Sequence, residues 1–161
     1  MGEVMREETQ ETPLAPWMHL VTTGGGLRLD QLLPASGHVY VARLNGQDMT
    51  DEMSTFENFY SSLKFPEYFG WNWDAFYDCL RDLQWLSADY HILIIDSADS
   101  ALRQDSDART EFFRSLWRAG KRWSYTKRPE GVTLSRFSVV LSCDQESASN
   151  LARDLRQFQN Q

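Results

Sequence analysis

The stretch FPEYFGWNWDAFYDCLRDL, residues 65–83, decides how this chain is interpreted. Asn72 is a favourable N-cap residue, so we expect a helix to begin directly after it. Asp74, Asp78 and Asp82 then recur every four residues and follow one ridge of that helix, apart from its apolar side. Like charges at this spacing weaken a helix by about 0.2–0.5 kcal/mol per pair, so three of them need an explanation.

The three aspartates have a structural interpretation. Asp74 lies in the first helical turn, where a carboxylate gains about 0.3–1 kcal/mol from the helix dipole. Asp78 can pair with Arg81 three residues on, and Asp82 can simply be solvated. The dipole does not reach Asp78 or Asp82, however, and the single Arg81 cannot neutralise three carboxylates.

A functional interpretation is an acidic ridge that meets the cations of a partner. Aromatic residues beside charges are typical of protein-binding hot spots. Four of them occur within six residues: Tyr68, Phe69, Trp71 and Trp73. Paired carboxylates also serve metal and acid–base sites, although no histidine is close and the spacing matches no motif.

Composition places the chain among ordinary globular proteins. Its 161 residues suffice for one domain, and 42% are hydrophobic. The net charge is −7, and residues 40–96 carry 10 acidic and 3 basic side chains, whereas residues 97–130 carry 5 and 8. An acidic surface of this kind repels nucleic acid and attracts basic partners.

Cysteine usage and the N-terminus indicate a cytoplasmic protein. Cys79 and Cys143 lie far apart without metal-ligand spacing, which favours free thiols in a reducing compartment. The acidic, polar N-terminus does not resemble a signal peptide, and no apolar run is long enough to span a membrane. We expect a monomer in the free state, without cofactor or metal.

Alternating strand and helix patterns predict an α/β fold with a small parallel sheet of three strands. Residues 54–63 carry a possible capping box, with Ser54 as N-cap and Glu57 inside the helix. The strands are expected at 38–44, 90–96 and the second half of 131–143, and the helices at 54–63, from Asn72 onward, at 107–123 and at 146–159. Residues 17–22 are compatible with one further short strand.

These elements divide the chain into four parts. Residues 1–16, which contain two prolines and no apolar periodicity, are expected to form a flexible lead-in. An N-terminal extension at 17–37 precedes the main domain at 38–143. The last part, 144–161, is expected to be a C-terminal helix packed on that domain.

The stretch GKRWSYTKRPEG, residues 120–131, is basic although the chain as a whole is acidic. Its cations interleave with Trp123 and Tyr125, as in a small RNA-binding patch. The alternative is the solvated end of a helix, where cations complement the helix C-terminus. Both interpretations remain open from the sequence.

The opening stretch resembles the signature segment of the barstar family, small intracellular inhibitors of secreted ribonucleases. The family pattern is Pro-Glu-Tyr-aromatic-Gly-x-Asn-x-Asp-Ala-x-x-Asp-Cys-Leu, and it matches Pro66, Glu67, Tyr68, Phe69, Gly70, Asn72, Asp74, Ala75, Asp78, Cys79 and Leu80. The resemblance covers about residues 38–143. It implies a barstar-like three-layer fold, with a three-stranded parallel sheet packed by helices and with N- and C-terminal extensions.

The resemblance also implies a mechanism without catalysis. The second helix and the loop before it would block a ribonuclease active site, with carboxylates in the places of RNA phosphates. Asp78 would be the central charge, Asp74 would pair with a neighbouring basic group, and Tyr68 would stack on the catalytic histidine. Gly70 and Asn72 would make backbone and polar contacts, and Trp73 would form an apolar rim.

The expected partner is a basic extracellular-type ribonuclease or a related toxin, bound as a 1:1 complex. The expected partner-binding residues are Tyr68, Phe69, Gly70, Asn72, Trp73, Asp74, Tyr77, Asp78 and Asp82. The alternative is an immunity or regulatory module for a basic partner other than a ribonuclease. A carboxylate metal enzyme and an RNA binder are the remaining hypotheses.

Two positions depart from the family pattern. The family has an acidic residue in its third helix that reaches the enzyme, and here Arg118 lies near that place. An exposed tryptophan after the second helix aligns with Leu83, although Trp85 is close. Both departures predict a partner that differs from the well-known family enzyme.

Overall fold

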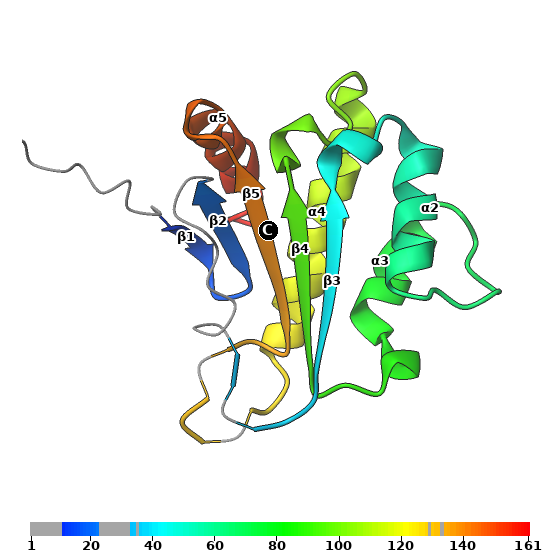
Figure 1. Cartoon of the computed structure of the whole chain (residues 1–161), viewed down its shortest axis with the longest axis vertical. Helices are drawn as coiled ribbons and strands as arrows, with labels where there is room; N and C mark the ends of the chain where they lie inside the picture. The colour runs from blue at the N-terminus through cyan, green and yellow to red at the C-terminus, as the bar shows by residue number, and fades with distance from the viewer. Residues whose placement is uncertain (1–10, 23–32, 35, 129, 133) are drawn as a thin grey trace, which may run out of the picture.

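The computed structural model describes residues 11–22, 33–34, 36–128, 130–132 and 134–161, which fold into one sheet covered by helices (Figure 1). The strands are β1 (Glu11–Ala15), β2 (Met18–Thr22), β3 (Val39–Asn45), β4 (Tyr90–Asp96) and β5 (Phe137–Cys143). The α-helices are α2 (Glu52–Ser62), α3 (Trp73–Asp82), α4 (Ser106–Ser124) and α5 (Gln145–Arg156). Three short 3₁₀ turns are η1 (Gly46–Asp48), η2 (Gln84–Leu86) and η3 (Ala98–Ser100).

The sheet has five strands in the order β1-β2-β5-β4-β3, so the α/β class holds but the three-stranded prediction is wrong. β3, β4 and β5 are the three expected parallel strands. β2 adds a fourth parallel strand alongside β5, and β1 adds an antiparallel edge. Residues 11–15, expected within the flexible lead-in, therefore form a strand, while residues 1–10 lie outside the described residues. Pro13 argued against a strand in the sequence, because proline is excluded from central strands. It is tolerated at the edge of a sheet, where β1 lies.

Side-chain alternation in the strands separates the two faces of the sheet. In β4, Leu93 and Ile95 belong to the main core with the helices, whereas Ile92 and Ile94 belong to a smaller cluster on the other face. Buried side chains of α2, α3, α4 and α5 all belong to the main core, which places these helices on one face of the sheet; Figure 1 shows α4 running behind the strands. The described residues thus form two layers, and the three-layer prediction is wrong for them.

The N-terminal hairpin is fixed to the domain by Trp17, which lies between β1 and β2. A Cβ atom at Gly120 of α4 would lie 2.2 Å from the Trp17 ring, so only glycine permits this contact. Trp17 also packs edge-on against Trp117, with ring centroids 5.4 Å apart. Near the end of the chain, the Gln159 side chain donates a hydrogen bond to the Leu14 carbonyl, which joins both terminal segments to the same region.

Helix α2 begins one turn earlier than its predicted cap. Asp51 is the N-cap, and its carboxylate accepts a 2.7 Å hydrogen bond from the Ser54 amide. The Ser54 hydroxyl oxygen in turn accepts a 3.0 Å bond from the Asp51 amide, which completes a capping box. The prediction of Ser54 as N-cap with Glu57 was therefore wrong, because aspartate caps as well as serine does and supplies the earlier start.

Phe76 holds α3 against the rest of the core. Its side chain is fully buried, with ring centroids 4.8 Å from Phe59 of α2 and 6.1 Å from Phe112 of α4. Phe65 and Trp73 contact the same ring at 6.2 and 5.4 Å. Aromatic pairs at such distances add to the free energy gained by burial alone.

We predict that Phe76→Ala lowers the free energy of unfolding by about 3–5 kcal/mol, because it leaves a cavity among the other rings. Urea denaturation of the full chain measures this loss. Tyr68→Ala is the matched control, since the Tyr68 side chain is exposed and should cost less than about 0.5 kcal/mol. A loss of stability for Phe76→Ala as small as that of the control would contradict the assigned role of Phe76.

His91 predicts a pH dependence of stability. Burial lowers its pKa below the ordinary 6.5, and the Arg136 carbonyl and the charge of Asp89 oppose this only in part. Below pH 6.5 the unfolded chain therefore binds a proton that the folded chain does not, and the free energy of unfolding falls as the pH falls toward the lowered pKa. Denaturation at a series of pH values should show this slope, and His91→Leu should remove it. Parallel slopes in the two proteins would rule out His91 as the cause.

Candidate partner-binding site

Helix α3 begins at the cap that the sequence predicts. The Asn72 side-chain oxygen accepts a 2.8 Å hydrogen bond from the Ala75 amide, which confirms Asn72 as the N-cap. The Asn72 side-chain nitrogen donates to the Gly70 carbonyl at 3.1 Å and so ties the preceding loop to the helix. At the other end Leu83 takes a left-handed conformation with φ 52°, and this turns the chain into η2.

The aspartates of α3 lie away from its buried side. Phe76, Cys79 and Leu80 are buried, whereas Asp74 and Asp78 are exposed and Asp82 is partly exposed. The Asp78 carboxylate, 61% exposed, lies 3.4 Å from the Arg81 guanidinium. Within the described part of the chain, Asp74 and Asp82 form no salt bridge. Exposed pairs such as Asp78–Arg81 hold their partners weakly, so the ridge keeps most of its negative charge available.

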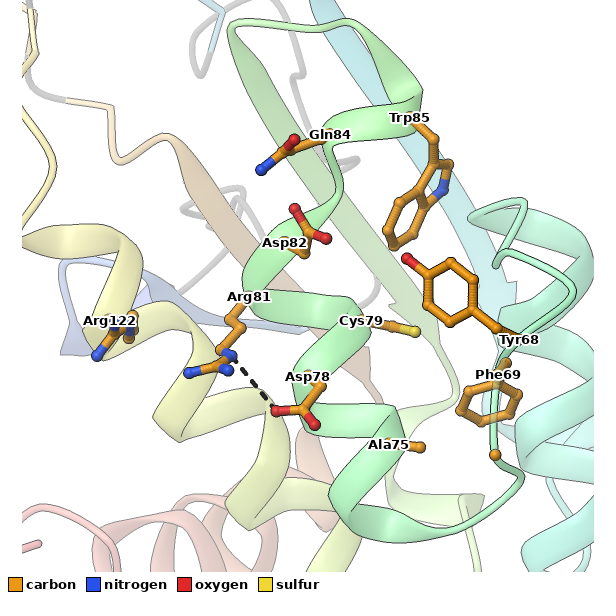
Figure 2. A pocket seen from close by; sticks show the side chains of 11 residues that line it. Tyr68, Phe69, Ala75, Asp78, Cys79, Arg81, Asp82, Gln84, Trp85 and Arg122 are labelled. Atoms are coloured by element: carbon orange, nitrogen blue, oxygen red, sulfur yellow. Dashed lines mark ion pairs between the residues drawn. The ribbon is translucent and has the colours of Figure 1, made fainter.

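A groove of about 580 Å³ separates α3 from the loop before it. Figure 2 shows Asp78, Cys79 and Asp82 on the helix opposite Tyr68 and Phe69 on the loop, with Trp85 at one end. The remaining lining residues are Gly70, Ala75, Arg81, Gln84 and Arg122. The groove thus combines two carboxylates, two guanidinium groups, an exposed tyrosine and a tryptophan in one concave surface.

The thiol of Cys79 lies close to two carboxylates of this groove. Burial is the main cause that raises its pKa to about 11, and the negative potential of Asp78 and Asp82 contributes in the same direction. A negative potential of this kind disfavours a thiolate and favours a bound cation. Cys79 is therefore a neutral group under the acidic ridge and no candidate nucleophile.

The loop that faces α3 is held in a fixed shape. Lys64 and Trp71, at its two ends, take left-handed conformations with φ 51° and 52°, which are unfavourable for such side chains. The Trp71 ring stacks on Tyr60 with centroids 5.2 Å apart. Phe69 is buried and packs against Phe65, with centroids 5.0 Å apart. These contacts leave the Tyr68 ring 75% exposed at the edge of the groove.

The structure brings five of the nine predicted site residues to this groove: Tyr68, Phe69, Gly70, Asp78 and Asp82. Phe69 lies beneath the surface and supports the loop from the core side. Asp74 is exposed on the first turn of α3 outside the groove, and Asn72 is occupied as the N-cap.

The two remaining predicted residues have contacts within the protein. The Trp73 ring nitrogen donates a 2.9 Å hydrogen bond to Glu52, and its ring packs on Phe56 with centroids 4.6 Å apart. Tyr77 faces α4 and lies under the Arg118 guanidinium, 4.4 Å from the ring centroid. Both are half-buried and stabilise the position of α3.

Six groove residues lie outside the predicted set. Three of them belong to α3 itself, Ala75, Cys79 and Arg81, and the other three are Gln84, Trp85 and Arg122. Trp85 carried a signal in the sequence, because it lies near the place of the family's exposed tryptophan. Its ring nitrogen donates to the Leu63 carbonyl at 2.8 Å, and this contact fixes the ring at the end of the groove. Gln84 follows α3 directly but carried no such signal, and Arg122 is brought beside α3 only when the chain folds.

The metal and RNA hypotheses gain little from the geometry. Among the residues that the structure describes, no group of three or more His, Cys, Asp or Glu is placed to hold a metal ion. In the basic stretch, the Trp123 ring nitrogen donates to the Leu80 carbonyl at 2.9 Å, so this ring is committed to packing. Tyr125 is 77% exposed and remains available on the surface.

Comparison with known proteins supplies the family. The family model described as barstar (barnase inhibitor) matches residues 39–141, well over half of the chain. The chain belongs to the barstar family. A comparison with curated proteins gives no match.

The barstar match contains the whole candidate site. It begins at the first residue of β3, includes α2, α3 and α4, and ends within β5. The hairpin β1–β2 and helix α5 lie outside it. Members of the barstar family are inhibitors that bind ribonucleases of the barnase type, and they are not enzymes. Among the described residues, no helix combines the length and apolar character needed to cross a membrane.

We predict that Asn72→Ala destabilises the chain by about 1 kcal/mol, because the Ala75 amide loses its cap acceptor. Asn72→Asp is the matched control, since it keeps a carboxylate acceptor at the same place and should cost less. Chemical denaturation of the three proteins measures the difference. Equal losses in the two variants would show that the cap contributes nothing and that the bond to Gly70 matters instead.

Proposed function

We propose that this chain inhibits a secreted or toxic ribonuclease by inserting α3 and the preceding loop into its active site. The observation that carries the proposal is the groove in which Asp78 and Asp82 stand beside the exposed Tyr68, in a chain of the barstar family. A ribonuclease active site is a basic cleft, because it binds a phosphate backbone. Carboxylates on a rigid helix can occupy the places of two phosphates in such a cleft.

Each side of the groove has a role in this proposal. Asp78 enters the centre of the basic cleft and exchanges its weak pairing with Arg81 for cations of the enzyme. Asp82 and Asp74 extend the negative charge along the helix. Tyr68 stacks on the catalytic histidine, and Gly70 lets the loop backbone approach the enzyme closely. Trp85 forms the apolar end of the interface, a role that we assign to it in place of Trp73.

Rigidity favours tight binding by this surface. Association costs free energy wherever side chains or loops must be ordered at the interface. Here the loop is already fixed by Asn72, Phe69 and Trp71, and α3 is fixed by Phe76. The partner therefore meets a surface that needs little rearrangement.

The state of the cysteines agrees with inhibition inside the producing cell. Both cysteines, Cys79 and Cys143, are free and buried, as expected for a reducing compartment. An inhibitor held in the cytoplasm would protect the cell from a ribonuclease before its export. We expect a 1:1 complex without cofactor.

The same surface also fits a basic partner other than a ribonuclease. The observation in favour of this second candidate is Arg118, a cation near the place where the family carries an acidic contact. Such a change alters partner choice, because like charges at an interface exclude the wrong partner. The groove and its carboxylates would act in the same way toward either partner.

We predict that Asp78→Ala raises the dissociation constant for a barnase-type ribonuclease by more than about tenfold, because enzyme cations are left buried without a partner. Inhibition of RNA cleavage by a titration of the chain measures the effect. Asp107→Ala removes the same charge from an exposed position on α4 and should change inhibition little. Folding of both variants should match the parent, as checked by thermal denaturation.

Two outcomes would contradict the proposal. If the parent chain inhibits no barnase-type ribonuclease, the enzyme class is wrong and the second candidate takes its place. If it inhibits but Asp78→Ala behaves like Asp107→Ala, the groove is not the inhibitory surface.

A further inference from the structure

A second hollow, of about 260 Å³, lies beside the acidic groove on the side of α4. Its lining includes Tyr77, Trp117, Arg118, Lys121, Arg122 and Tyr125. Three of the lining residues are cationic, and none has a carboxylate side chain. Arg122 lines this cationic hollow and the acidic groove, so the two are neighbours on one surface.

The cations of the hollow are positioned by packing. The Arg118 guanidinium lies over the Tyr77 ring, 4.4 Å from its centroid, so a side chain of α3 holds a cation of α4. The Lys121 ammonium donates to a main-chain oxygen of Gln161, which also lines the hollow. Arg118 and Arg122 form no salt bridge with any described residue, and both are exposed. Their guanidinium donors are thus free to bind an anion.

A carboxylate is the anion that this arrangement fits. A guanidinium held over a ring keeps its donors in a restricted orientation, and a pair of these donors matches the two oxygens of a carboxylate. The volume admits one acidic side chain, and the aromatic rings of Tyr77 and Trp117 provide an apolar wall for its methylene groups. Such a contact excludes water and strengthens the charge pairing.

We propose that the cationic hollow receives an aspartate or glutamate side chain of the same protein partner whose basic cleft covers the acidic groove. The proposal rests on the proposed function and adds a second, oppositely charged contact to it. A nucleic acid is the poorer occupant, because Asp78 and Asp82 in the adjoining groove repel its phosphates. A protein partner can instead place one carboxylate beside its own cations.

This second contact sets the orientation and the choice of the partner. A surface with acids on α3 and bases on α4 pairs fully only with a surface of the opposite arrangement. A partner with a basic residue opposite Arg118 and Arg122 is repelled there, even when its cleft fits the acidic groove. The hollow therefore distinguishes among partners that the groove alone would accept.

Hexaglutamate peptide is the probe that tests the hollow without a ribonuclease. Titration into the ¹⁵N-labelled full chain should shift the backbone amides of Tyr77, Arg118 and Arg122, with saturation in the millimolar range. The double variant Arg118→Gln/Arg122→Gln should abolish these shifts. Lys127→Gln, which neutralises an exposed cation outside the hollow, should leave them unchanged. If the loss of the Arg118–Tyr77 contact disturbs the fold, Arg122→Gln alone should still weaken binding.

Three outcomes would overturn the proposal: no peptide-induced shift in the parent chain, shifts that survive in the double variant, or tighter binding of hexauridylate RNA than of the peptide at the same amides. The last outcome would assign the hollow to nucleic acid. Failure of this proposal can be told apart from failure of the proposed function. If the chain inhibits a ribonuclease but does not bind the peptide, only the proposal for the hollow is wrong. If the chain binds the peptide but inhibits no barnase-type ribonuclease, the proposed enzyme class is wrong and the carboxylate site stands.

Discussion

The packing of Phe76 among the rings of α2, α4 and the loop before α3 is the interaction on which the rest of the structure depends. It fixes which side of α3 is buried and therefore which side faces solvent. Once this ring is buried, Asp78 and Asp82 are directed toward the groove, since helical geometry leaves them no other place. The acidic surface follows from the core packing and not from the carboxylates themselves.

The fold keeps this acidic surface available at a cost in stability. Three carboxylates along one helix repel each other, and only Asp78 has a cation within salt-bridge distance among the described residues. The left-handed conformations of Lys64 and Trp71 add backbone strain in the same region. Strain and repulsion concentrated at one surface are typical of functional sites, because a partner that supplies the missing charges relieves the repulsion.

Local features of the site could be predicted from the sequence, and tertiary ones could not. Asn72 as N-cap and the aspartate ridge follow from neighbours within one or two helical turns, so the sequence contains them fully. Phe69 and Trp73 were assigned to the partner surface, yet Phe69 is buried and Trp73 half-buried, because aromatic residues serve cores and interfaces alike. Arg122, forty residues after α3, joins the groove only through chain folding. The additional strands β1 and β2 are short, and β2 gains its register from the distant β5.

The central claim is that an acidic surface, held open by the core, meets a basic cleft. The barnase–barstar pair is the reference case for electrostatically steered association. The expectation of steered association for this chain therefore derives from its family as well as from the groove. The most direct test is the association rate of the chain with a barnase-type ribonuclease, measured by stopped-flow over a range of salt concentrations. We expect an association rate that falls steeply as salt rises, with a much smaller change in the dissociation rate. An association rate independent of salt would contradict it.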